Sequence, residues 1–130
     1  MSDLVKIDPQ TIALVRGLMD GKGALKPFVQ EIMLIECHVA GTTHVDIEAV
    51  EPDLKPGSIL HLKREPRNKH DPRAIVIFDD QSRRIGYIPE RKNEALANLM
   101  DAGKLLFGKL EKKEWRGNWL RVSVRVFMQD

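Results

Sequence analysis

Residues 60–89, LHLKREPRNKHDPRAIVIFDDQSRRIGYIP, contain three strand-like segments and one charged loop. Apolar and polar residues alternate at positions 60–63, whereas positions 75–78 are apolar and rich in β-branched side chains. Apolar residues return at 85–88, after the turn-like sequence DDQS. Alternation of this kind and β-branched runs bounded by turn residues are typical of strands, so we expect three short strands here.

The charged loop, residues 64–72, separates the first two of these strands. Pro66 and Pro72 have a fixed φ and no backbone donor, so neither suits the middle of a sheet. Asn68 and Asp71 have short side chains that accept hydrogen bonds from nearby backbone amides, and we expect both to close Asx turns. The sequence therefore predicts a rigid, polar and basic loop.

The residues before this stretch predict one helix and one buried strand. Residues 8–20 combine an Asp-Pro start with apolar residues at helical spacing, which indicates an amphipathic helix. The apolar run at 32–35, within residues 28–40, suits a buried strand. Residues 46–54 are ambiguous, because Pro52 limits any helix there to a turn or two.

The residues after this stretch predict a second helix and a hairpin. We expect the helix to begin at Pro89 and end at Gly103, because apolar residues repeat at helical spacing between them. Residues 104–114 and 119–128 read as two strands joined at the turn 116–118. About six strands with short connections favour a mainly β fold, a curled antiparallel sheet or small barrel with two short helices at its rim.

The composition suits one compact domain. The chain has 130 residues, of which 42% are hydrophobic. We divide it into an N-terminal helix with its connector, residues 1–27, and a β domain, residues 28–130. No apolar run approaches the roughly 20 residues that cross a bilayer, and the first residues, MSDLVKIDPQ, lack the basic region and apolar block that are typical of a secretory signal. The lone Cys37 fits a reducing compartment, so we expect a soluble, cytoplasmic protein.

Charge is unevenly distributed along the chain. Residues 1–57 carry 5 Lys and Arg against 9 Asp and Glu, whereas residues 58–130 carry 16 against 10, so the two parts have charges of −4 and +6. A basic face that meets phosphates is one interpretation of this asymmetry, and an ordinary solvated surface is the other.

Five ordered motifs of the chain resemble those of the HIRAN domain, a small module of fork-remodelling ATPases that also occurs as free-standing bacterial proteins. The motifs are VAG at 39–41, KPG at 55–57, REP at 64–66, NxHDPxAI at 68–75 and IGYIP at 85–89. The resemblance covers roughly residues 34–127. It implies a small OB-like or SH3-like antiparallel barrel that is not an enzyme. It also implies binding of single-stranded DNA or DNA ends, at a free 3′ end in characterised eukaryotic members, and a part in DNA repair.

The same resemblance implies a pocket for the DNA end, formed in family members by an Arg-Tyr pair, a Tyr-Asp pair and a basic residue. The corresponding positions here are Thr43, His44, His70, Asp71, Glu90 and, one place on, Arg91. Asp71 is retained, and its carboxylate is expected to accept a hydrogen bond from a terminal hydroxyl. His44 and His70 keep a flat face for stacking on bases, but Thr43 offers no charge to a phosphate, and Glu90 would repel one.

Basic residues near the charged loop are candidates for phosphate contacts, because single-strand binding needs a basic groove and flat side chains. These candidates are Arg64, Arg67, Lys69 and Arg73. The alternative for the loop is a solvated turn without a ligand. Tyr87 is expected to be either a base platform or a packing residue at the rim. Trp115 and Trp119 are expected to pack across the hairpin or to form an exposed aromatic patch.

No catalytic residue, metal site or cofactor is expected. Glu65 with Asp71 is a weak signal for a divalent metal site. Cys37 and His38 are neighbours on a predicted strand and would point to opposite faces, so Cys37 is expected to be a small core residue. The sequence has no GxxxxGK[ST] loop and no GxSxG motif.

Two functions therefore stay open. The first is a non-catalytic nucleic-acid-binding module for single-stranded DNA or DNA ends, without membrane contact. The second is a protein-interaction or assembly module that uses the same barrel without nucleic acid. In this second function the N-terminal helix either docks on the barrel or packs against a second copy or a protein partner. The residues at positions 43, 44 and 90 favour the second function, because they differ from the family pattern.

Overall fold

The computed structural model describes residues 30–129, and the predicted helix at 8–20 with its connector lies outside them. Six strands run through the described residues, and every pairing between them is antiparallel. They are β1 (Glu31–His38), β2 (Ile59–Arg64), β3 (Ile75–Phe78), β4 (Arg84–Tyr87), β5 (Leu105–Arg116) and β6 (Trp119–Gln129). The strands predicted within residues 60–89 and the C-terminal hairpin are confirmed, with ends shifted by one or two residues.

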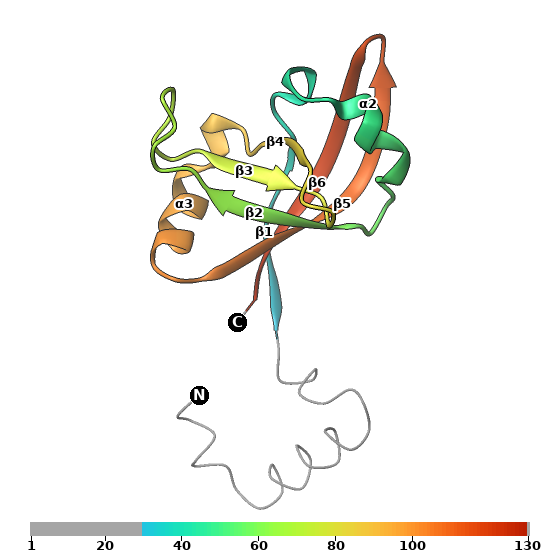
Figure 1. Cartoon of the computed structure of the whole chain (residues 1–130). Coiled ribbons are helices and arrows are strands. Elements are labelled where there is room, and N and C mark those ends of the chain that lie inside the picture. Colours follow the sequence, from blue (N-terminus) through green and yellow to red (C-terminus); the bar gives the residue numbers. More distant parts are fainter. Residues whose placement is uncertain (1–29, 130) are drawn as a thin grey trace, which may run out of the picture. The chain divides into compact units, whose positions relative to one another are not determined.

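The strands form one sheet in the order β1-β6-β5-β2-β3-β4, which curls strongly into a half-barrel (Figure 1). An antiparallel bridge joins Ala40, just beyond β1, to Tyr87 at the end of β4. Each of the two residues donates its backbone N–H to the carbonyl oxygen of the other over 2.8 Å. The bridge therefore ties the two outermost strands of the sheet together. The predicted mainly β, barrel-like fold of about six antiparallel strands is confirmed.

Two short helices and three 3₁₀ turns connect the strands. They are α2 (Ile47–Val50), α3 (Glu94–Asp101), η3 (Thr42–His44), η4 (Glu51–Asp53) and η5 (Glu90–Lys92). Pro52 indeed limits the helix at this place to one turn. The predicted helix start at Pro89 is wrong, because this residue has an extended ψ of 138°; η5 follows it, and α3 begins only after Asn93. None of the helices within residues 30–129 has the length and apolar character that a membrane crossing requires.

The core is built from apolar side chains that point inward from the strands and the short helices. Gly108 faces Leu60 and Val126 in the register, and a Cβ on it would lie 2.9 Å from a methyl group of Val124, so its missing side chain allows β5 to pack closely. Cys37 belongs to the same core, and burial raises the pKa of its thiol to about 11. The prediction of a small core residue at this position is therefore confirmed.

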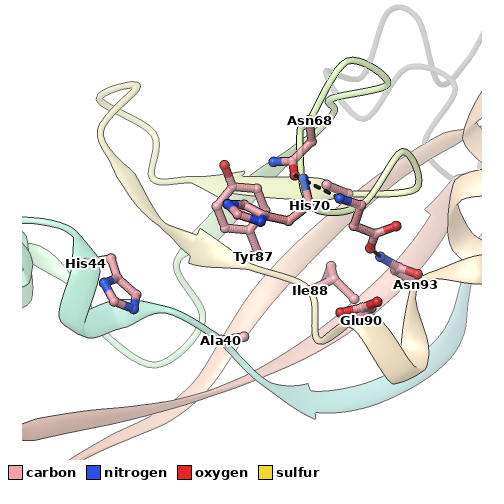
Figure 2. A pocket seen from close by; sticks show the side chains of 10 residues that line it. Ala40, His44, Asn68, His70, Tyr87, Ile88, Glu90 and Asn93 are labelled. Carbon is pink, nitrogen blue, oxygen red and sulfur yellow. Dashed lines mark hydrogen bonds between the residues drawn. The ribbon is translucent and has the colours of Figure 1, made fainter.

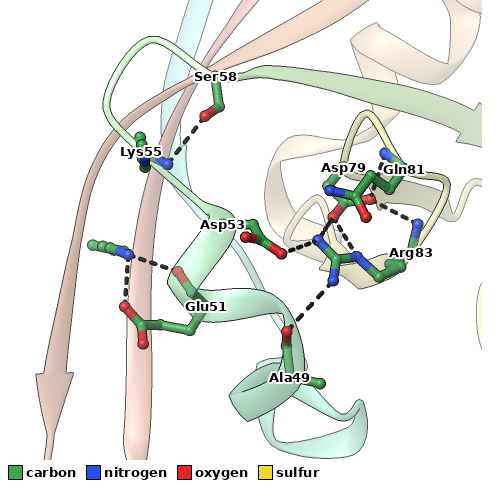
Figure 3. Close-up of polar contacts among 9 residues, drawn as sticks. Ala49, Glu51, Asp53, Lys55, Ser58, Asp79, Gln81 and Arg83 are labelled. Carbon is green, nitrogen blue, oxygen red and sulfur yellow. Dashed lines mark hydrogen bonds and ion pairs between the residues drawn. The ribbon is translucent and has the colours of Figure 1, made fainter.

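A buried carboxylate anchors the chain between β1 and β2 to the turn between β3 and β4 (Figure 3). Asp79, which is 3% exposed, accepts hydrogen bonds from the backbone N–H groups of Gln81 (3.0 Å) and Arg83 (2.8 Å). The guanidinium of Arg83 donates to Asp79 Oδ2 (2.8 Å) and to Asp53 Oδ2 (2.9 Å). A longer contact of 3.4 Å reaches the carbonyl oxygen of Ala49. The α2–η4 segment is thereby held to the sheet.

The two tryptophans at the tip of the β5–β6 hairpin do not pair with each other. Trp115 pairs with Leu120, and Trp119 pairs with Arg116. Because neighbouring positions of a ladder alternate between faces, the two indoles project from opposite faces of the hairpin. They are 43% and 38% exposed. The expected packing of one tryptophan against the other across the hairpin is therefore wrong, since the two lie one position out of register.

Candidate functional site

A pocket of about 470 Å³ opens beside the bridge between Ala40 and Tyr87. Segments far apart in the sequence contribute to it: the chain around η3, the loop between β2 and β3, the end of β4 and the turn η5. The lining residues are Ala40, His44, Asn68, His70, Asp71, Ala74, Tyr87, Ile88, Glu90 and Asn93. His44 lies on one side of the pocket, and Glu90 and Asn93 lie on the other (Figure 2). Four residues predicted to bind nucleic acid thus meet here.

Two successive Asx turns give the loop between β2 and β3 its shape. Asn68 Oδ1 accepts hydrogen bonds from the backbone N–H groups of His70 (2.9 Å) and Asp71 (3.0 Å). Asp71 Oδ1 accepts one from the N–H of Arg73 (2.9 Å). The predicted Asx turns are therefore confirmed, and they hold His70 and Asp71 in the wall of the pocket.

Asp71 is held from a second side by Asn93. The side-chain amide of Asn93, which is 2% exposed, donates to Asp71 Oδ2 over 2.7 Å. The hydrogen bonds from the Arg73 N–H and from Asn93 keep the pKa of Asp71 below its ordinary value, so the group is a carboxylate at neutral pH. Each of its oxygens receives one of these two bonds and retains a lone pair. Asp71 is therefore a fixed acceptor that can receive a hydroxyl group from a ligand.

Tyr87 lines the pocket with its ring and anchors its hydroxyl outside it. The hydroxyl donates to Glu65 Oε1 over 2.8 Å, and the amide of Asn68 donates to the same oxygen over 3.1 Å. The guanidinium of Arg84 binds Glu65 Oε2 over 3.1 Å and lies 5.6 Å from the centroid of the Tyr87 ring. Burial and the bond to Glu65 raise the pKa of Tyr87. The ring is thus held in one orientation, which suits both packing at the rim and stacking.

Glu65 does not join Asp71 in a metal site, because its two oxygens are engaged by Tyr87, Asn68 and Arg84. Burial favours a higher pKa for Glu65, but these hydrogen bonds and the charge of Arg84 outweigh it and leave the pKa below the ordinary 4.5. Within residues 30–129, no group of three or more His, Cys, Asp or Glu is placed to hold a metal ion.

We expect acid to weaken the fold partly through Glu65. Its pKa is lower in the folded protein than in the unfolded chain, so its stabilising effect is present above the unfolded pKa and disappears as pH falls through the folded pKa. The variant Glu65→Gln should therefore show a smaller fall in Tm between about pH 5 and about pH 3 than the original protein. Glu48→Gln, a change in an exposed side chain of α2, should keep the original profile. Identical profiles for Glu65→Gln and the original protein would contradict this linkage.

The turn η3 places His44 in the pocket and leaves Thr43 outside it. Gly41 enters the turn with φ of 78°, a conformation that suits glycine. Thr42 is buried, and its hydroxyl donates to the carbonyl oxygen of Leu120 over 3.0 Å, which fixes the turn to β6. Thr43 is exposed and does not line the pocket, whereas His44 does.

Arg64 has a different role from the predicted phosphate contact. Its side chain is 14% exposed, and Nε and Nη2 donate to the carboxylate of Asp101 in α3 over 2.9 and 3.2 Å. Two further bonds reach the carbonyl oxygens of Ala74 (2.8 Å) and Pro72 (3.0 Å). Four internal hydrogen bonds occupy most of the guanidinium donors, so Arg64 fixes the loop to α3.

The other predicted basic residues belong to two segments that form the pocket, the loop between β2 and β3 and the turn η5, but no Lys or Arg among residues 30–129 lines it. Arg73 forms an ion pair with Glu94 at the start of α3, over 3.2 Å. Arg67, Lys69 and Arg91 are exposed and form no ion pair within residues 30–129. Their charges are therefore not neutralised by an acidic side chain of the described residues.

The family model of the HIRAN domain matches residues 32–129. A solved protein from Lactobacillus plantarum is 27% identical with a TM-score of 0.73, and the match covers 78% of this chain and 98% of that one. The HIRAN domain of human HLTF is 17% identical with a TM-score of 0.60, over 76% of this chain and 78% of that one. The HLTF HIRAN domain in its DNA-bound conformation is 18% identical with a TM-score of 0.54, over 77% and 79%. These last two matches show a shared fold, and no curated protein matches the chain in sequence.

Proposed function

The chain belongs to the HIRAN domain family, whose domain is a binding module, and we propose that it binds single-stranded DNA or DNA ends without catalysing a reaction. The observation that carries the proposal is the pocket beside the Ala40–Tyr87 bridge, where an ordered carboxylate and two imidazoles lie among apolar side chains. The DNA-bound conformation of the HLTF HIRAN domain supports DNA as the class of ligand. A cytoplasmic location and a part in DNA repair belong to the same proposal.

Each group in the pocket has a role in this proposal. Asp71 accepts the hydroxyl group at the 3′ end, because its oxygens are ordered and retain lone pairs. His44 and His70 offer flat faces to the terminal bases, and the fixed ring of Tyr87 extends that surface. The phosphates run outside, along Arg67 and Lys69, with Arg73, Arg91 and the polar Thr43 at the rim.

Fluorescence anisotropy tests the proposal with 5′-labelled single strands of about ten nucleotides, a length within the range that small single-strand-binding folds cover. A strand with a free 3′ hydroxyl should bind more tightly than the same strand with a 3′ phosphate. Affinity should fall as salt is added, because contacts to phosphates release counterions. Absence of binding at low salt for every single-stranded ligand would reject the proposed function.

The double variant Arg67→Ala, Lys69→Ala should weaken binding to strands with free and with blocked 3′ ends by the same factor. Each lost phosphate contact should lower the slope of log affinity against log salt by about 0.7, so the slope should fall by about 1.4. The double variant Lys55→Ala, Lys112→Ala removes the same charge from exposed positions outside the pocket and should keep the original slope. Equal slopes for both double variants would exclude the loop from the phosphate path.

A second candidate function is assembly with another copy of this chain through the outer face of the sheet. Met33 and Leu105 are 51% and 66% exposed, and both lie beside β6, opposite Phe127 and Gln129. Positions two apart share a face of a strand, so these side chains lie on the same face as the stacked pair Phe107 and Phe127. The ammonium group of Lys109 lies over both rings. Apolar surface of this kind is typical of interfaces, in contrast to scattered exposed residues.

Light scattering tests this second function on the full chain. Met33→Glu should convert a dimer into a monomer, because it places a charge in the apolar surface. Trp115→Glu, at an exposed apolar position on the opposite face of the sheet, serves as the comparison. A monomeric original protein at high concentration would reject assembly as the function.

A further inference from the structure

The lining of the pocket selects an uncharged ligand group that donates hydrogen bonds. Its wall contains two acids, Asp71 and Glu90, together with two imidazoles and two carboxamides, and none of the Lys and Arg residues that the structure describes contributes to it. A phosphate inside the pocket would therefore meet two carboxylates and no permanent positive charge. Hydroxyl groups suit the same wall, because each can donate to a carboxylate.

Glu90 and Asp71 line the same pocket. Glu90 is the first residue of η5 and Asn93 follows three positions later, a spacing that places side chains above one another on a 3₁₀ turn. Asn93 is bonded to Asp71 over 2.7 Å, and Glu90 and Asn93 lie on the same side of the pocket (Figure 2). Within residues 30–129, the Glu90 carboxylate forms no hydrogen bond or ion pair, although the residue lines the pocket and is exposed. Its oxygens are therefore available to a ligand.

On the basis of the proposed function, we propose that Glu90 makes this pocket selective for a strand that ends in a ribonucleotide. Asp71 accepts the 3′ hydroxyl, and Glu90 accepts the adjacent 2′ hydroxyl, which a deoxyribose lacks. The 2′ hydroxyl is the group by which proteins distinguish RNA from DNA. A basic residue at position 90 would instead attract a phosphate. The Glu90 carboxylate repels a phosphate and accepts a hydrogen bond from a hydroxyl group.

The experiment compares three labelled strands of one DNA sequence that differ only at the 3′ terminus: a deoxynucleotide, a single ribonucleotide, and a ribonucleotide with a 3′ phosphate. The ribonucleotide end should bind about tenfold more tightly than the deoxynucleotide end, as expected for one hydrogen bond to a charged acceptor. The 3′-phosphorylated strand should bind most weakly, because its charge faces two carboxylates.

Glu90→Ala should make the ribonucleotide and deoxynucleotide ends bind alike, because the acceptor for the 2′ hydroxyl is lost. Glu48→Ala removes the same charge from an exposed position of α2 outside the pocket and should retain the tenfold preference. Equal binding of the two ends by the original protein, with both above the phosphorylated strand, would overturn the ribonucleotide selectivity and leave the proposed function standing. Failure of all three strands to bind would reject the proposed function itself. Retention of the preference in Glu90→Ala would overturn the role of Glu90.

Discussion

Replacing Gly86 by alanine is expected to lower the free energy of unfolding by about 4 kcal/mol, through overpacking together with an unfavourable backbone conformation. Gly86 lies in β4 with φ of 153°, where L side chains are rarely found. A Cβ there would lie 2.4 Å from the carbonyl oxygen of Ala40 and 2.4 Å from a methyl group of Val39. Because that oxygen accepts the hydrogen bond from the Tyr87 N–H, the side chain cannot fit unless the bridge opens.

Denaturant unfolding measures the effect, and Gly57→Ala provides the matched control. Gly57 also has a positive φ, 89°, but a Cβ on it would have no atom within 4 Å. The control should therefore lower the free energy of unfolding by about 1 kcal/mol, which is the contribution of backbone strain without a clash. Equal costs for the two variants would contradict the close approach of β4 to the chain beyond β1. Because Ala40 and Tyr87 both line the pocket, Gly86→Ala should also weaken nucleic-acid binding.

The local part of the fold could be predicted from the sequence. The run 75–78 is a strand with the predicted bounds, and the C-terminal hairpin is present as expected, because side-chain alternation is expressed in neighbouring residues. The closure of the half-barrel could not be predicted in this way. Nothing in the pattern around Gly86 indicates that a backbone oxygen more than 40 positions earlier will lie against it.

The start of α3 also could not be predicted from the local sequence. Apolar spacing indicated the helix of residues 94–101, but its start depends on the turn η5, which is closed by a bond from the Lys92 N–H to the carbonyl oxygen of Pro89. Asn93 then binds Asp71 in the loop between β2 and β3, a contact between distant segments. Proline at the first helical position is a statistical preference, and tertiary contacts overrode it here.

The candidate site was predictable in part. The turn chemistry of Asn68 and Asp71 is local, so their hydrogen bonds followed from the residue types. Arg64 was assigned to phosphates because it is basic and lies beside the loop, but its partner Asp101 is 37 positions away. Asn93 was missed for the same reason, since its partner is 22 positions away, and its only sequence signal was an amide residue in front of an apolar helical pattern.

Asp71→Ala is expected to abolish the preference for a free 3′ end while reducing total affinity far less. In the proposed function, the carboxylate supplies the acceptor for the terminal hydroxyl, whereas Arg67 and Lys69 supply the phosphate contacts that a strand with a blocked end also makes. The ratio of the two dissociation constants, blocked end over free end, should fall by about tenfold toward one, the loss that one hydrogen bond to a charged acceptor predicts. Anisotropy titrations of both strands give this ratio directly.

Asp71→Asn separates the loss of the acceptor charge from damage to the loop. Its amide oxygen can still accept the hydrogen bond from the Arg73 N–H, so the turn should persist, but its neutral oxygen binds a hydroxyl more weakly than a carboxylate does. We therefore expect a ratio between those of Asp71→Ala and the original protein. The hydrogen bond that the Asn93 amide donates to Asp71 Oδ2 is lost in this variant, because an amide NH2 group stands in place of that oxygen. Asp80→Ala, at an exposed position of the β3–β4 turn outside the pocket, should leave the ratio unaltered. Equal losses of affinity for free and blocked ends in Asp71→Ala would show that the carboxylate shapes the loop and does not contact the end of the strand.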